Sequence, residues 1–235
     1  WSSLESITAG VSERNLGHDE HVIFATLPCI GLDYPVKQLF AIRGVAKELE
    51  WGPLGQGDSA VDIKTANLAM IYEALKRDDI KDQIKANLNM YPYAKYRFGQ
   101  FIEICQEPFN LGTKIQRHME KVELQIHRIY RIRNAIVHSA LTHERLDLLT
   151  VNLEHYLRGA LNAMVYMMEH AQSILTPEEA FTRYLFLTES IIGELDPSYS
   201  VKDKKKKEKA KRKLDAEDVN PFSSLFSFLK SDKKE

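Results

Sequence analysis

The chain has 235 residues, 44% of them apolar, and a formal net charge of −1 at pH 7. These values are typical of an ordinary globular protein with one large domain or two small ones. The charge is uneven, because residues 1–196 contain 20 basic and 26 acidic residues, whereas residues 197–235 contain 12 basic and seven acidic ones. The body therefore lacks the broad basic face of a protein that wraps nucleic acid, and any nucleic acid must be bound locally.

The sequence also bears on the compartment. Cys29 and Cys105 lie in apolar stretches without metal-ligand spacing and indicate reduced core thiols of a cytoplasmic protein. No apolar run approaches the ~20 residues of a membrane span, and no signal-peptide pattern is present. Because the chain begins with Trp1 rather than Met, we expect it to be part of a longer protein with an upstream domain.

The few glycines and prolines divide the first part of the chain into helical segments. A helix is expected from Ser59 or Asp62 to Lys76, after a clear break at 52–57, with four inward-facing residues. Those residues are Ile63, Ala66, Met70 and Ala74. The other helices expected in this part cover 1–9, 19–32, 35–50, a polar segment 78–88 and an aromatic segment 92–106.

Longer helices follow. Residues 110–140 contain no proline, and no glycine after Gly112, which predicts one helix of roughly 28 residues. Thr142 is expected to cap a second long helix, and Thr176-Pro-Glu-Glu is a strong start signal for a third that ends near Gly193. Since no strand pattern is present, we predict an all-α, up-and-down bundle over 1–196.

The C-terminal part departs from this pattern. Residues 197–219 are predicted to be a Lys-rich flexible linker, and 220–235 a short amphipathic segment. Asn220-Pro221 can start a helix with an apolar stripe. The stripe consists of Phe222, Leu225, Phe226 and Leu229. It either docks into a groove of a partner or packs back on its own bundle, and the sequence does not choose between the two.

The long segment 110–140 has an apolar seam with a charged residue in its middle. At 100° per residue, eight residues fall within about 60° of Arg133. They are Ile115, Met119, Val122, Ile126, Ile129, Ile136, Val137 and Ala140. Their 4-3-4-3 spacing predicts a helix that is buried along much of its length. Because an unpaired buried charge is costly, Arg133 needs partners or a cleft that contains water.

A polar edge runs beside this seam, with Tyr130 at its border. It consists of Glu123, His127, Arg131, Asn134 and His138. Each residue alone has an ordinary structural explanation: an Arg that snorkels or pairs with a carboxylate, a His satisfied in the core, or an Asn bonded to a loop. Their clustering favours a functional site. A competing cluster, residues 18–21 (His-Asp-Glu-His), lacks a third ligand site, so its acids are better explained by the helix dipole than by a metal.

These residues resemble a known family. Arg133-Asn134-x-x-x-His138 resembles the Arg-x4–6-His signature of HEPN (higher eukaryotes and prokaryotes nucleotide-binding) domains, where it lies on a long helix of an α-bundle. The Tyr-Arg-Ile before the motif and the Ile-Val before its His are similar as well. Trp1-x-x-Leu4-Glu5 resembles the first helix of C-terminal HEPN domains in anti-phage defence proteins. The resemblance covers about residues 1–175, without the loop at 52–60.

The resemblance implies a homodimer in which two copies of the motif face one another, and cleavage of RNA by its own 2′-hydroxyl without a metal or other cofactor. Arg133 would hold the phosphate and His138 would transfer protons. Asn134 would orient His138 or the phosphate. Four further residues are candidates for binding the substrate. They are Arg128, Arg131, His127 and Tyr130.

The function predicted on this basis is a metal-independent endoribonuclease, the toxin or effector of a prokaryotic anti-phage defence system. Its partners would be RNA, with tRNA as one candidate, a second copy of the chain, and an upstream sensor or a separate protein. A related branch of the family is regulated through a Tyr two positions after the motif His, and here Ala140 stands at that position. The alternative is a non-catalytic helical module that binds a partner or a nucleotide.

Overall fold

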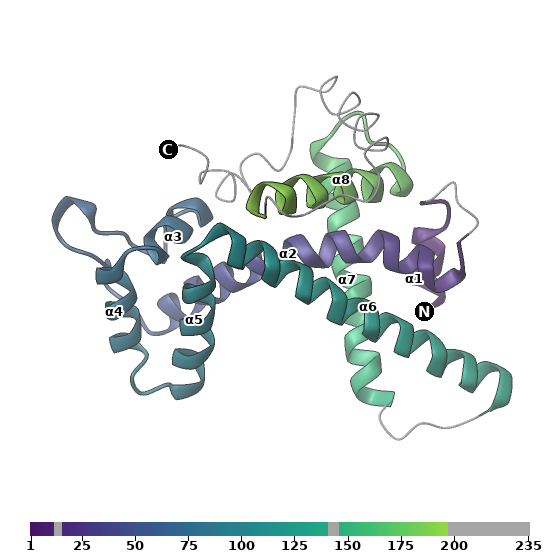
Figure 1. Ribbon diagram of the computed structural model, residues 1–235, viewed down its shortest axis with the longest axis horizontal. Helices are drawn as coiled ribbons and strands as arrows, with labels where there is room; N and C mark the ends of the chain where they lie inside the picture. The colour runs from purple at the N-terminus through teal and green to yellow at the C-terminus, as the bar shows by residue number, and fades with distance from the viewer. Residues whose placement is uncertain (12–15, 141–145, 197–235) are drawn as a thin grey trace. The chain divides into compact units, whose positions relative to one another are not determined.

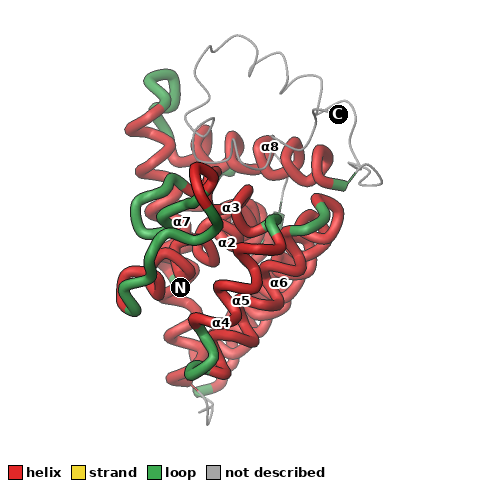
Figure 2. The backbone as a smooth tube through the Cα atoms, turned by 90° about the vertical axis from the view of Figure 1, so that its left-hand side faces the viewer, coloured by secondary structure: helices red, strands yellow, loops and turns green. Residues whose placement is uncertain are grey.

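The computed structural model describes residues 1–11, 16–140 and 146–196. In these ranges the protein is all-α, as predicted, with eight α-helices packed as a bundle and a short 3-10 helix, η1 (Gly57–Ser59) (Figure 1). The described residues contain no strand, as the tube in Figure 2 shows. Leu54 and Val61 form an isolated antiparallel bridge.

The described chain divides into two compact units. Unit 1 comprises Trp1–Asp33 and Gln116–Ser190, and unit 2 comprises Tyr34–Ile115 and the described residues from Ile191 onward. The helices are α1 (Ser2–Thr8), α2 (His18–Glu48), α3 (Leu68–Leu75), α4 (Asp78–Asn87), α5 (Pro92–Cys105), α6 (Pro108–Ser139), α7 (Leu146–His170) and α8 (Pro177–Leu195). The sequence predicted one helical domain over 1–196.

The prediction of two helices over 19–32 and 35–50 is wrong, because α2 continues through Pro28 and Pro35. Proline removes one backbone hydrogen bond and disfavours a helix interior. Here that cost is offset by an apolar seam at helical spacing, which continues on both sides of Pro35. Its buried residues are Val22, Ala25, Cys29, Leu32, Val36, Leu39, Ile42 and Ala46. Burial of this seam outweighs the local breaking signal.

The start of α3 also differs from the prediction. Asn67 caps the helix, since its Oδ1 accepts a hydrogen bond from the Met70 backbone N–H at 2.8 Å. Asp62 instead closes a turn, with its Oδ1 accepting from the Lys64 backbone N–H at 3.0 Å. The expected inward position Met70 is 50% exposed because the helix begins later than predicted. The other three expected inward residues are buried: Ile63, Ala66 and Ala74.

The capping signal before α8 is confirmed. The Thr176 Oγ1 accepts from the Glu179 backbone N–H at 3.2 Å, and the Glu179 Oε2 accepts from the Thr176 backbone N–H at 3.1 Å. The single long helix predicted over 110–140 is also confirmed, as α6. Thr142 and the segment 197–235, with its predicted linker and apolar stripe, lie outside the described residues.

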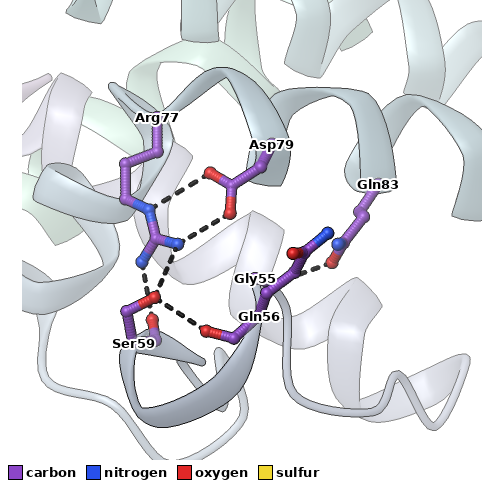
Figure 3. A network of polar contacts seen from close by, with 6 residues as sticks. All are labelled: Gly55, Gln56, Ser59, Arg77, Asp79 and Gln83. Atoms are coloured by element: carbon purple, nitrogen blue, oxygen red, sulfur yellow. Dashed lines mark hydrogen bonds and ion pairs between the residues drawn. The ribbon is translucent and has the colours of Figure 1, made fainter.

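Arg77 ties the loop before α3 to the start of α4 within unit 2 (Figure 3). Its Nε and Nη2 donate to the Asp79 carboxylate at 3.2 and 2.7 Å, and its Nη1 donates to the Ser59 carbonyl at 2.6 Å. The Gln83 Oε1 accepts from the Gly55 backbone N–H at 2.8 Å. A paired guanidinium and a side-chain amide thus hold a glycine-rich loop that has no regular structure beyond η1 and one bridge.

The two cysteines are free and buried, as predicted. Burial strongly raises the pKa of the Cys29 thiol, and its Sγ donates to the Ala25 carbonyl at 3.3 Å. Among the described helices, none combines the length and apolar character that crossing a membrane requires.

Candidate functional site

The apolar seam of α6 changes character along the helix. Within unit 1, Val122, Ile126 and Ile129 are at most 5% exposed. Past Arg133 the same seam reaches solvent, since Ile136 is 38% and Val137 59% exposed. The predicted burial is thus confirmed as far as Ile129 and ends there, and the charged residue lies at the point of change.

Arg133 is half-buried, and its Nη1 donates to the Oδ1 of the adjacent Asn134 at 2.9 Å. Among the described residues, no carboxylate forms an ion pair with this guanidinium. A guanidinium carries five N–H donors in a planar fork, so one bond to a neutral amide leaves most of them for another acceptor. Arg133 is therefore equipped to bind an anion.

His138 is exposed in the last turn of α6. Among the described residues, no hydrogen bond joins Asn134 to His138, and the Asn134 Oδ1 accepts from Arg133. The helix ends just beyond, where Ala140 has a positive φ of 48°. In a single chain the motif thus places a guanidinium–amide pair and a free imidazole about one helical turn apart.

Two of the predicted substrate-binding residues already have partners within unit 1. The His127 Nδ1 lies 2.9 Å from the Asp19 Oδ2, which joins α6 to the start of α2. The Tyr130 ring packs on the Trp1 ring, with centroids 5.3 Å apart and planes tilted by 38°. These contacts hold the motif helix in position. Sequence reasoning assigned Asp19 to the dipole of its own helix and missed this pairing across more than 100 residues.

The other two, Arg128 and Arg131, are exposed and form no ion pair among the described residues. On the helical wheel, Arg131 points within about 20° of His138, whereas Arg128 lies farther round. This part of the helix has no acid of its own, since residues 124–143 contain no Asp or Glu, and the acid that contacts it is Asp19, at His127. This segment is therefore a local basic region in a body that is acidic overall.

The ends of α6 and α7 that flank residues 141–145 carry a group of exposed apolar side chains, which we call the apolar tip. It consists of Ile136 (38% exposed), Val137 (59%), Leu146 (37%), Leu148 (63%) and Val151 (62%). Figure 1 shows both helix ends extending beyond α2 and α8. Two of these side chains, Ile136 and Val137, lie within the motif segment itself.

The described residues contain no group of His, Cys, Asp or Glu that could hold a metal ion. The cluster at 18–21 lies among these residues and forms no such group. His18 instead lies 3.8 Å from Glu5. No protein-family model, curated protein or solved structure matches the chain. The likeness to HEPN domains thus rests on the motif and its helical setting.

Proposed function

We propose that the protein is a metal-independent endoribonuclease whose site is built from Arg133, Asn134 and His138 at the end of α6. The observation that carries the proposal is the state of Arg133: a half-buried guanidinium in an apolar seam, bonded to one neutral amide and to no carboxylate of the described chain. A structural arginine in such a position pairs with an acid or extends its charged end into solvent. A phosphate-binding arginine keeps its donors for the substrate.

The active form in this proposal is a homodimer joined through the apolar tip. A single chain leaves five large apolar side chains exposed beside the motif, and a two-fold axis would pair this patch with itself. The two motifs would then line one cleft, and each Arg133 would border water and substrate rather than a dry core. A second copy also supplies a second imidazole.

The proposed reaction is cleavage of a phosphodiester by the neighbouring ribose 2′-hydroxyl. The 2′-oxygen forms a bond to phosphorus, the bond to the 5′-oxygen breaks, and the products are a 2′,3′-cyclic phosphate and a 5′-hydroxyl. One proton leaves the 2′-hydroxyl and one reaches the 5′-oxygen, both transferred by His138 side chains. General acid–base catalysis of this kind contributes roughly 10²–10⁴-fold. Arg133 stabilises charge on the phosphoryl oxygens.

The test is to incubate the protein with tRNA or total RNA in EDTA, beside Arg133→Ala and His138→Ala. The expected result is cleavage by the wild type that leaves cyclic phosphate ends, and a loss of at least roughly 100-fold in each variant. DNA of the same sequence should survive because it lacks the 2′-hydroxyl. Equal cleavage by all three proteins, or none by the wild type, contradicts the proposal, and a metal requirement contradicts the mechanism.

The setting we propose is the effector part of a prokaryotic anti-phage defence system, held inactive by an upstream sensor or a partner protein. The second candidate function is a non-catalytic helical module that dimerises or docks a partner. It is favoured by one observation, namely that the Asn134 oxygen is engaged by Arg133 and does not orient His138. A dimer without cleavage in the assay above would select this candidate.

A further inference from the structure

A second acid-free region lies in unit 2, at the start of α5. Residues 83–102 contain three cations and no Asp or Glu. This acid-free segment is as long as the motif segment 124–143. In a body with more acidic than basic residues, such a stretch is a local excess of positive charge along the sequence. Of the three cations, Lys95 and Arg97 are on α5 itself.

The same turns of α5 carry large side chains that the core of unit 2 does not use. Tyr93 is 73% and Tyr96 67% exposed. These two rings are not needed to pack α5 against unit 2, because another face of the helix is already buried there. The residues on that face are Phe98, Phe101, Ile102 and Cys105. The helix therefore has two aromatic faces, one packed inside and one presented to solvent.

The exposed rings and Arg97 form one surface. Tyr93, Tyr96 and Arg97 follow the i, i+3, i+4 spacing that places side chains next to each other on a helix. The Arg97 guanidinium carbon lies 5.8 Å from the centre of the Tyr93 ring, and its Nη1 lies 3.5 Å from the Tyr93 hydroxyl. Lys95 lies on another side of the helix, where its Nζ donates to the Asn89 Oδ1 at 2.9 Å. We call Tyr93, Tyr96 and Arg97 the tyrosine platform.

We propose that the tyrosine platform binds single-stranded RNA. Its two rings offer stacking surfaces to unpaired bases, and Arg97 lies beside the Tyr93 ring, in reach of the backbone phosphates of a stacked strand. Stacking on a side chain requires bases that are not already stacked in a duplex, so the platform selects single strands. The positive charge without acid favours a polyanion over a protein groove. The proposal deepens the proposed function, on which the choice of RNA rests.

The experiment measures the binding of a fluorescent 12-nucleotide RNA by anisotropy, in the His138→Ala background so that the probe stays intact. Tyr93→Leu/Tyr96→Leu removes the rings and should weaken binding by at least roughly tenfold. Tyr93→Phe/Tyr96→Phe keeps them and should bind as the parent does. Arg97→Gln should lower the slope of log affinity against log salt by about 0.7. Phe109→Ala, which removes another exposed aromatic ring of unit 2 (51% exposed), is the matched control and should change nothing.

Equal binding by the Leu and Phe double variants would overturn the proposal, as would equal affinity for a duplex of the same sequence or no binding of RNA. A single-stranded DNA arm separates base stacking from recognition of ribose. DNA that binds as well as RNA supports stacking on the rings, and DNA that does not bind assigns a contact to the 2′-hydroxyl. Because the assay measures binding without cleavage, its result is independent of the cleavage assay. RNA binding by the platform can be confirmed when the nuclease proposal is contradicted, and the nuclease proposal can be confirmed when platform binding is contradicted.

Discussion

Arg77 and Arg133 are both half-buried arginines, and their surroundings differ in kind. Arg77, in unit 2, donates to both oxygens of Asp79 and to the Ser59 carbonyl, and its Nη2 also lies 3.2 Å from the Ser59 hydroxyl. Arg133, in unit 1, donates to the amide oxygen of its neighbour Asn134. The first guanidinium is satisfied by its own protein and closes a loop. The second retains donors that its described surroundings do not use.

The difference suggests a way to tell a structural arginine from one that is free to bind a ligand when both are half-buried. Exposure alone does not separate them. What separates them is the number and charge of the acceptors, because a carboxylate neutralises a guanidinium and a neutral amide does not. From this difference in acceptors we expect substitutions around Arg77 in unit 2 to change stability. We expect substitutions around Arg133 to change assembly and catalysis.

The largest effect is expected at the apolar tip. Leu148→Glu/Val151→Glu places two negative charges in the proposed interface of each copy, and like charges that face each other there cost several kcal/mol. The dimer should therefore dissociate at micromolar concentration, with loss of RNA cleavage. The mass in solution, by light scattering, measures this.

Leu124→Glu is the matched control for that prediction. Leu124 is 68% exposed on α6, about 180° around the helix from Arg133, and its substitution should leave the dimer intact. A wild-type protein that is monomeric, or a dimer that survives the double substitution, contradicts assembly through this surface.

An intermediate effect is expected at Gly55, which has a φ of +97°. A Cβ there would lie 2.8 Å from the Arg77 Nη2, an atom already held by Asp79 and Ser59. Gly55→Ala should lower the free energy of unfolding by about 1–2 kcal/mol from the backbone conformation alone. Urea denaturation checks this, with Gly52→Ala, where a Cβ meets nothing within 4 Å, as the control. Equal stability of the two variants would mean that the folded loop does not hold Gly55 in this backbone conformation.

The smallest effect is the acid dependence of the Arg77 network. The hydrogen bond from Arg77 lowers the pKa of Asp79 below its ordinary value of 3.8. Because the folded-state pKa is depressed, the stabilisation is complete above the unfolded-state pKa and is lost as pH falls through the folded-state pKa. Between pH 5 and pH 2 the wild type should lose more stability than Asp79→Asn, as measured by urea denaturation at each pH. Parallel curves for the two proteins would rule out this contribution.

Local signals predicted much of the fold and of the motif. The capping residues before α8 and the uninterrupted α6 were visible because both depend on neighbouring residues in the sequence. The continuity of α2 through Pro35 was not, because it depends on burial of a seam that outweighs a local breaker. The sequence feature that indicates this continuity is the helical spacing of the apolar seam, which is kept on both sides of Pro35.

The site shows the same limit. The spacing of Arg133, Asn134 and His138 could be read from the sequence, but their contacts could not. His127 was predicted to bind substrate, yet it pairs with Asp19 at 2.9 Å, a partner more than 100 residues away. Such pairings depend on which helices pack together, and a helical wheel does not contain that information. Whether the motif residues act on RNA stays a prediction.

The measurement that tests the central claim most directly compares the free energies of unfolding of Arg133→Ala and Arg77→Ala. Both variants are made in the Leu148→Glu/Val151→Glu background, so that dimerisation does not contribute to stability. We predict that Arg133→Ala unfolds within about 0.5 kcal/mol of its parent, whereas Arg77→Ala is clearly less stable because Asp79 and the Ser59 carbonyl lose their donor. A loss of stability in Arg133→Ala as large as that in Arg77→Ala would show that Arg133 is a structural residue and would contradict the account.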